Sequence, residues 1–281
     1  MLTGKGLIAG VMGWPVSHSR SPLLHGFWLR QYGIDGAYVP LSVSPERAEQ
    51  AMRALPALGF RGCNVTIPHK ETAFRIVDRL HPSARRIGAV NTIIVADDGT
   101  LEGRNTDGYG FWENLAAKAP QSWSIVRGPS VVLGAGGAAR AVVVALLDAG
   151  APEIRLLNRT AARAAEIAAD LGDPRIKVGN WQERDQSLSD AVLLVNSTSQ
   201  GMTGHPPLEI DLAALPPDAV VNDIVYVPLV TPLLAAASAR GNPIVDGLGM
   251  LLHQARPGFH AWFGTDPQVT DELHRFVLDP Q

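Results

Sequence analysis

The sequence of 281 residues contains only one cysteine, Cys63. A single thiol excludes an intrachain disulfide and a zinc site built from cysteines. The longest purely apolar run is AVVVALL at 141–147, far below the roughly 20 residues that a membrane-spanning helix needs. The segment MLTGKGLIAGVMGWP lacks the charged start, apolar core and small-residue cleavage site of a signal peptide. We therefore expect a cytoplasmic enzyme or binding protein.

An excess of positive charge is also missing. Lys and Arg number 24 against 27 Asp and Glu, which gives a formal net charge of −3. This balance offers no electrostatic basis for binding nucleic acid or an anionic membrane. No His, Asp or Glu cluster has the spacing of metal ligands, so no metal is expected. The expected partners are small molecules, and the sequence leaves monomer and homodimer open.

Short apolar segments alternate with helical patterns in the first part of the chain. The Asp98-Gly99 pair predicts the turn of a hairpin over 89–107. Ser21, followed by Pro22 and an apolar stretch, predicts a helix with Ser21 as its N-cap. The pattern indicates a mixed sheet with helices packed on it. The other elements expected here are strands at 7–13, 37–43 and 62–68 and a helix over 45–58.

The order of elements becomes regular after a polar connection at 121–130. Apolar strands beginning near 131, 154, 176, 191 and 219 alternate with longer segments, two of which have clear helical patterns. Such alternation predicts a doubly wound parallel sheet of the Rossmann type. The last stretch, from about Gly247, is again helical and aromatic. The expected fold class is α/β with two domains, a mixed-sheet domain and a parallel-sheet domain.

The segment VVLGAGGAAR carries Gly134, Gly136 and Ala139 in the G-x-G-x-x-G/A spacing, between a strand and a helix. The first glycine allows a tight turn, the second lets the backbone approach a pyrophosphate, and the small third residue lets the helix pack on the strand. In this context the motif predicts a dinucleotide site.

The next strand, IRLLN, indicates which dinucleotide binds. A site for NAD usually ends this strand with Asp or Glu, which accepts a hydrogen bond from the ribose 2′-hydroxyl. Here the strand ends at Asn158, and Arg159, Thr160 and Arg163 follow. Guanidinium groups bind a 2′-phosphate, which a carboxylate would repel. The sequence therefore favours NADP(H), and two solvated arginines are the alternative.

Candidates for the chemistry lie in NVTIPHK, AVNT and NTDG. Lys70 could exchange the proton that accompanies hydride transfer, and Asp107 could supply its partner charge. Ser17 and Ser19 lie just before a predicted helix N-terminus, where an anion is favoured, although a solvated serine loop is the alternative. The loop NSTSQGM at 196–202 could line a site or form turns.

These segments together resemble the shikimate dehydrogenase family. The matching motifs, in order from about residue 10 to residue 256, are SHSRSP, NVTIPHK, AVNT, NTDG, GAGGAAR, NRTAAR, NSTSQGM, DIVY, TPLL and GLGMLLHQA. The resemblance implies reversible reduction of 3-dehydroshikimate to shikimate with NADPH, a step of aromatic amino-acid biosynthesis towards chorismate. It implies a substrate domain at 1–108, joined by C-terminal helices at 248–281, and an inserted NADP domain at 109–247, with the active site in the cleft between them.

The resemblance also implies roles for individual residues. Lys70 and Asp107 match the catalytic pair, and Ser17 and Ser19 match serines that bind the substrate carboxylate. Asn64 is expected to support its loop rather than touch the substrate. The other substrate positions are Thr66, Asn91, Tyr226 and Gln254, besides Lys70 and Asp107. The cofactor positions are Gly134, Ala135, Gly136, Gly137, Ala138, Asn158, Arg159, Thr160, Arg163, Ile224 and Gly247.

Three alternative functions remain open at this stage. A paralogue that accepts quinate, often with NAD, is disfavoured because NRTAAR lacks an acidic residue. A regulatory module that has lost the chemistry is disfavoured by the presence of Lys70 and Asp107. The assignment as a folate-type dehydrogenase is disfavoured by the presence of the serine loop and of the NTDG motif. The chain departs from the family pattern at Val227 and Val230, to which no chemistry is assigned.

Overall fold

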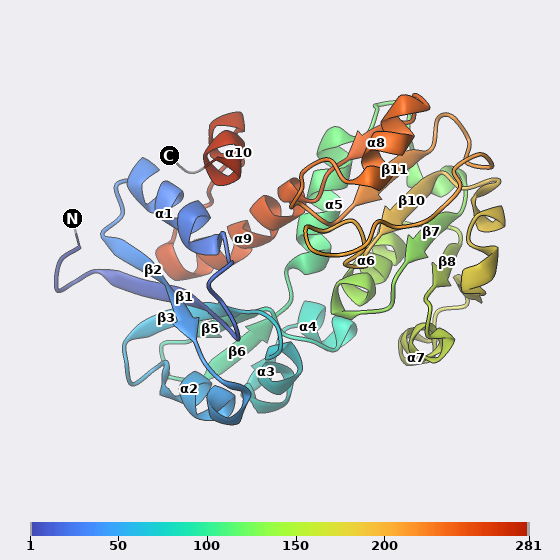
Figure 1. Ribbon diagram of the computed structural model, residues 1–281. Helices are drawn as coiled ribbons and strands as arrows, with labels where there is room; N and C mark the ends of the chain where they lie inside the picture. The colour runs from blue at the N-terminus through green and yellow to red at the C-terminus, as the bar shows by residue number, and fades with distance from the viewer. Residues whose placement is uncertain (1, 280–281) are drawn as a thin grey trace. The chain divides into compact units, whose positions relative to one another are not determined.

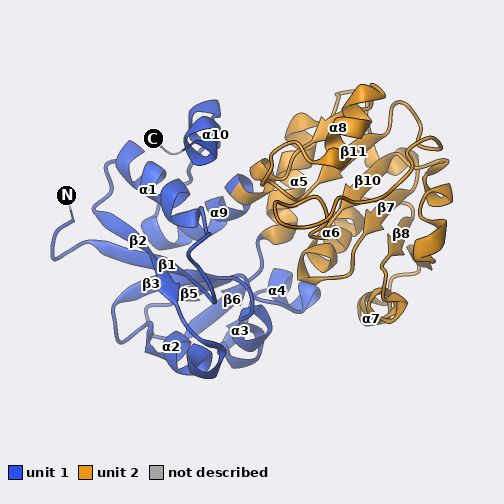
Figure 2. Ribbon diagram, in the orientation of Figure 1, with its two compact units in different colours: residues 1–106, 252–281 blue, residues 107–251 orange. Residues whose placement is uncertain are grey.

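The computed structural model describes residues 2–279 and divides the chain into two compact units. Unit 1 comprises Met1–Thr106 and Leu252–Gln281, and unit 2 comprises Asp107–Leu251 (Figure 2). The chain thus crosses between units after Thr106 and after Leu251, where the sequence-based division lies at 108 and 248. Within residues 2–279, no helix is long and apolar enough to cross a membrane.

Unit 1 contains a mixed six-stranded sheet in the order β2-β1-β3-β5-β6-β4. Strand β1 pairs in parallel with β2 and β3, and the hairpin β5–β6 adds antiparallel to β3. Gly99, with φ of +80°, lies in the hairpin turn as expected. The strands are β1 (Leu7–Gly13), β2 (Gly36–Ser42), β3 (Phe60–Val65), β4 (Arg79–Leu80), β5 (Thr92–Val95) and β6 (Leu101–Arg104).

Helices cover both faces of this sheet (Figure 1). On one face, α2 and α3 enclose a core that includes Met52, Cys63 and Ile93. On the other face lie α1 and α9, whose Trp28 and Trp262 are buried and donate through their indole N–H groups to the carbonyls of Gln268 and Ile93. The helices are α1 (Ser21–Gln31), α2 (Ala48–Ala54), α3 (Lys70–Ile76), α4 (Pro82–Ile87), α9 (Leu248–Phe263) and α10 (Asp271–Leu278), with a 3₁₀ turn η1 (Pro45–Arg47).

Three local predictions for this unit were wrong. Arg20, not Ser21, is the N-cap of α1, because the helix already includes Ser21 and Pro22 in its first turn. Strand β3 ends at Val65 rather than at 68, since the chain turns there into α3. The helix expected over 45–58 is split into η1 and the shorter α2, and the sequence pattern missed α3 and α4.

Unit 2 contains an all-parallel six-stranded sheet in the order β12-β11-β10-β7-β8-β9. The order reverses between β7 and β10, so this sheet is doubly wound as expected and the predicted fold class is confirmed. The strands are β7 (Ser130–Leu133), β8 (Ile154–Leu157), β9 (Ile176–Gly179), β10 (Leu193–Asn196), β11 (Val220–Asp223) and β12 (Ile244–Val245).

Alternate residues of these strands enter two different cores. Val132 and Val195 pack with helices α5, α6 and α7 on one face, whereas Val131 and Leu194 pack with α8 on the other. Burial on both faces explains why the central strands β7 and β10 are mostly apolar. The helices are α5 (Asp107–Lys118), α6 (Gly137–Asp148), α7 (Ala161–Leu171) and α8 (Pro232–Ala239), with 3₁₀ turns η2 (Ile125–Arg127), η3 (Trp181–Glu183) and η4 (Gln186–Leu188).

Candidate functional site

The polar residues predicted in unit 1 follow or precede strands at one edge of its sheet. Strands β1 and β3 run in parallel, so the serine loop after Gly13 and the turn after Val65 leave the sheet on the same side. Strand β5 is antiparallel to β3, with Thr92 opposite Asn64, so Asn91 before it lies at that edge too. The predicted substrate residues of unit 1 that lie in loops therefore share one sheet edge.

In the serine loop, Ser17 is exposed and Ser19 is half-buried. The Ser19 hydroxyl accepts a hydrogen bond from the backbone N–H of Ser21 at 3.3 Å. Ser19 therefore supports the start of α1, the role expected of Ser21, while its own O–H can still donate to a ligand. The N-cap residue itself, Arg20, makes no side-chain cap hydrogen bond, so the dipole at this end of the helix can also stabilise an anion.

Asn91 lies in a buried hydrogen-bond network with Thr106. Its side-chain Nδ2 donates to Thr106 Oγ1 at 3.0 Å, and its side-chain Oδ1 accepts from the Thr106 backbone N–H at 2.9 Å. Thr106 Oγ1 lies 3.3 Å from Gln254 Oε1 on α9. The network brings together Asn91 and Gln254, which are separated in sequence by the whole of unit 2.

Lys70 is the first residue of α3 and is half-buried. Its backbone carbonyl accepts from Val90 N–H at 3.1 Å, which fixes the lysine next to the segment that carries Asn91. Thr66 is held in turn, because its N–H donates to the Met12 carbonyl at 2.9 Å. Asp107, which directly follows Thr106, is buried as the first residue of α5.

The glycine turn of unit 2 follows β7. Gly134 has φ of +111°, and a Cβ there would lie 2.6 Å from Ser197 Oγ, so glycine is required by both conformation and space. At Gly136 and Gly137 an added Cβ would meet nothing within 4 Å, so the backbone is open to a ligand. Gly136 is the N-cap of α6 and provides no side-chain cap; Ala135 precedes it, and Ala138 is the second residue of the helix. Uncapped N–H groups at a helix N-terminus form an anion site.

The predicted 2′-phosphate residues follow β8. Asn158 donates through its amide to the Thr160 carbonyl at 2.8 Å and so stabilises the turn into α7. Arg159 and Arg163 are exposed, and neither has a salt bridge to a described residue, whereas Arg140 and Arg175 of the same unit are paired with Asp170 and Asp173. Two unpaired cations at a helix N-terminus oppose its dipole, so the arrangement favours a bound anion.

Ile224 and Gly247 are in direct contact. A Cβ on Gly247 would lie 2.2 Å from the Ile224 carbonyl oxygen, so no side chain can be accommodated there. Tyr226 lies two residues after Ile224 in the sequence and is half-buried. The 196–202 loop contains a turn, in which the Thr198 hydroxyl donates to Asn196 Oδ1, and the Ser197 hydroxyl ties the loop to β7 by donating to the Leu133 carbonyl. These bonds do not distinguish a loop that lines a site from one that only forms turns.

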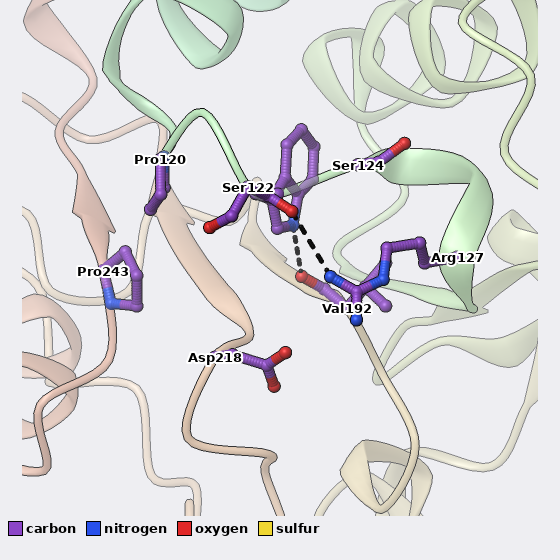
Figure 3. Close-up of a pocket in the computed structure, with 8 residues that line it drawn as sticks. Pro120, Ser122, Ser124, Arg127, Val192, Asp218 and Pro243 are labelled. Carbon is purple, nitrogen blue, oxygen red and sulfur yellow. Dashed lines mark hydrogen bonds between the residues drawn. The ribbon is translucent and has the colours of Figure 1, made fainter.

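A separate pocket of about 250 Å³ lies in unit 2 (Figure 3). Its residues Val192, Asp218 and Pro243 come just before β10, β11 and β12. The pocket is therefore at the amino ends of the strands, whereas ligands of open α/β sheets bind beyond the carboxyl ends. It is not the dinucleotide site.

No group of three or more His, Cys, Asp or Glu side chains among the described residues could hold a metal ion. Burial raises the pKa of the Cys63 thiol to about 12, so this cysteine is not a nucleophile near neutral pH.

Two family models match the chain. Residues 11–93 match the "Shikimate dehydrogenase substrate binding domain", and residues 115–203 match "Shikimate / quinate 5-dehydrogenase". A curated relative from Paramagnetospirillum magneticum, named shikimate dehydrogenase (NADP⁺), is 67% identical over 99% of this chain and 100% of its own length. The chain belongs to the shikimate dehydrogenase family.

Solved structures of this family and of related enzymes are similar over nearly the whole chain. Shikimate 5-dehydrogenase from Thermus thermophilus, in complex with NADP(H) and shikimate, is 37% identical with a TM-score of 0.85, over 97% of this chain and 100% of that one. Quinate dehydrogenase from Corynebacterium glutamicum, in complex with NAD, is 28% identical with a TM-score of 0.87, over 97% of each chain. The shikimate dehydrogenase family thus shares its fold with an NAD-bound quinate enzyme.

Sequence reasoning missed Thr106, which links Asn91 and Gln254, although it lies in the NTDG motif. Asn64 makes its hydrogen bonds across the sheet rather than within its own loop. Its amide donates to the Asn91 carbonyl at 3.2 Å and to Thr92 Oγ1 at 3.1 Å, and its oxygen accepts from Tyr38 at 2.6 Å. No motif pointed to Tyr38, because a buried tyrosine in a strand is indistinguishable from ordinary core in the sequence.

Proposed function

We propose that this chain catalyses the reversible reduction of 3-dehydroshikimate to shikimate with NADPH. The relative that is 67% identical is named for the shikimate reaction with NADP⁺. The structural observation that carries the proposal is the shared sheet edge in unit 1. The loops that leave this edge carry serine, threonine and asparagine residues, the types that a small polyol with a carboxylate requires. Unit 1 then acts as the substrate domain and unit 2 as the NADP domain.

Ser17 and Ser19 are proposed to donate hydrogen bonds to the substrate carboxylate. The exposed Ser17 and the O–H of Ser19 support this, as does the N-terminus of α1, whose N-cap Arg20 makes no side-chain cap hydrogen bond. Thr66, Asn91 and Gln254 are proposed to bind the ring hydroxyls. Asn91 and Gln254 are both held by Thr106, so their positions are set before the substrate arrives.

Lys70 is proposed to donate the proton that follows hydride transfer. Reduction of a ketone develops negative charge on its oxygen, which an ammonium stabilises and protonates. Asp107 is proposed to orient the lysine and to accept from a substrate hydroxyl, and Tyr226 to lie against the substrate.

NADP(H) supplies the hydride when bound. The residues of unit 2 fit this cofactor, because the turn at 134–138 offers open backbone and uncapped N–H groups for the pyrophosphate. Arg159 and Arg163, with Asn158 and Thr160, are proposed to hold the 2′-phosphate. Ile224 and Gly247 are proposed to contact the nicotinamide end through their backbones.

The test is an absorbance assay of NADP⁺ reduction with shikimate, run beside quinate and beside NAD⁺. Activity confined to shikimate with NADP⁺ is expected. Activity that is equal with quinate or NAD⁺ would assign the chain to the relaxed paralogue, and binding of NADP⁺ without turnover would indicate a regulatory module. The cytoplasmic location stays a prediction, which fractionation of cells expressing the tagged protein would check.

A further inference from the structure

Asp223 is a buried carboxylate at the carboxyl end of the unit 2 sheet. It is the last residue of β11, has 0% exposure, and directly precedes Ile224. Its partner across the ladder is Asn196, the last residue of β10, which is also 0% exposed. The pair therefore lies at the base of the loops that follow β10 and β11, at the sheet edge where the proposed nicotinamide contacts are found.

Three donors meet on the Asp223 carboxylate. Oδ1 accepts from Asn196 Nδ2 and from the Val225 backbone N–H, each at 3.0 Å, and Oδ2 accepts from Thr231 Oγ1 at 2.7 Å. Each donor belongs to a different segment: the end of β10, the turn that carries Ile224 and Tyr226, and the N-cap of α8. The carboxylate thus joins three segments at one point.

Asn196 extends the same network into the 197–202 loop. Its amide also donates to the Gln200 carbonyl at 3.1 Å, and its oxygen accepts from the Thr198 backbone N–H at 3.0 Å and from Thr198 Oγ1 at 2.7 Å. The Ile224 N–H donates to the Asn196 carbonyl at 3.1 Å. Both loops that follow β10 and β11 are therefore fixed relative to one another through two side chains.

Burial raises the pKa of Asp223 above its ordinary value, although its three hydrogen bonds act in the opposite direction. A buried carboxylate costs folding free energy that an apolar residue of similar size would not. Removing the carboxylate, however, leaves three buried donors without an acceptor. The desolvation cost therefore offsets much of what the hydrogen bonds of Asp223 add to the free energy of unfolding. The main effect of the residue is to fix one geometry of the loops that donate to it.

We infer that Asp223, with Asn196, is a positioning residue that sets the loop at 224–231 in the conformation that binds the nicotinamide end of NADP(H). The inference rests on the proposed function and goes beyond it, because neither side chain is assigned a contact with cofactor or substrate. Loss of the carboxylate lets the turn at Ile224 and Tyr226 shift while the glycine turn, on a different strand, stays in place.

The experiment compares Asp223→Ala with Asp223→Asn. In the asparagine variant, the amide oxygen can keep the donors Asn196 and Val225, and its N–H₂ can donate to Thr231, whose hydroxyl can also accept. We expect Asp223→Asn to stay within about threefold of wild type, whereas Asp223→Ala loses about 10- to 100-fold in kcat, the cost of misplaced reacting groups. The dissociation constant for NADP⁺, measured by calorimetry, should rise in the alanine variant only.

Asn242→Ala is the matched control. Asn242 is buried in the same unit and donates to the Pro216 and Ala219 carbonyls at 2.8 and 3.0 Å, but it lies before β12 at the amino ends of the strands. It should lower the Tm without changing kcat or KM. If Asp223→Ala fails to fold, Thr231→Val is compared with Thr231→Ser instead. The valine removes the hydroxyl that donates to Asp223, whereas the serine keeps it.

The inference is overturned if folded Asp223→Ala, or Thr231→Val, matches Asn242→Ala in kcat, KM and NADP⁺ affinity. Failure of the proposed function gives a different result, since wild-type protein would then show no NADP⁺ reduction with shikimate. The NADP⁺ affinities would still test the positioning role in that case.

Discussion

His25 on α1 gives a quantitative prediction about acid stability. The ring is 0% exposed and stacks on Tyr38 at 3.9 Å with an interplanar angle of 4°, and its edge faces Trp28 at 5.8 Å. Neither ring nitrogen has a hydrogen-bond partner among the described residues. Burial lowers the pKa of His25 from 6.5 to about 3, because a charged imidazole would be desolvated among aromatic rings.

The sign of the effect follows from proton binding. Between pH 6.5 and pH 3, the unfolded chain carries a proton on this histidine that the folded protein excludes. The free energy of unfolding therefore falls as pH decreases through this window, by about 1.4 kcal/mol for each pH unit below 6.5. From pH 7 to pH 5, His25 alone should remove about 2 kcal/mol of stability, a large fraction of the 5–15 kcal/mol typical of a domain.

The assay is guanidinium denaturation of wild type and His25→Phe at both pH values. The packing cost of phenylalanine enters at both pH values and cancels in the difference, so the variant should lose about 2 kcal/mol less than wild type between pH 7 and pH 5. His260→Phe, at an exposed position of α9, should retain the wild-type pH dependence. An equal loss in His25→Phe and wild type would refute the assignment of a neutral, buried imidazole.

Two further predictions concern the proposed reaction. Lys70→Ala should lower kcat by at least about 10²-fold with little change in the KM for shikimate, because a positioned acid–base group is lost; steady-state kinetics check this, and an unchanged kcat would remove Lys70 from the mechanism. Replacing Arg159 and Arg163 together by alanine should raise the KM for NADP⁺ by about 10- to 100-fold while leaving that for NAD⁺ unchanged, since only the former carries a 2′-phosphate. An equal change in KM with both cofactors would show that the two arginines do not bind the 2′-phosphate.

The unit 2 fold followed from the sequence because its parallel strands are short and mostly apolar and alternate with longer segments. The glycine turn was predicted for the right reason, since Gly134 has a positive φ and no room for a Cβ. In unit 1, helices α3 and α4 were not anticipated. They have only seven and six residues, too few turns for an apolar periodicity to emerge.

The wrong assignment of Ser21 has a specific physical cause. A serine before proline satisfies the pattern of an N-cap, but the neighbouring Ser19 satisfies the orphan N–H instead. Ser21 is then inside the helix and buried. With serines at every second position, the sequence alone cannot tell which one caps and which ones remain available to a ligand.

Supporting residues such as Asn64 and Asp223 illustrate a more general limit. Each lies within or at the end of a strand, beside residues proposed to contact a ligand, and each carries a polar side chain of the type that binds ligands. Only their burial and their partners distinguish them from residues that contact a ligand. Asn64 is hydrogen-bonded to β5 and to Tyr38, and Asp223 accepts hydrogen bonds from three segments of its own unit. A strand end therefore predicts where ligand chemistry is found, whereas the division between residues that touch the ligand and residues that hold those in place depends on the network of donors and acceptors.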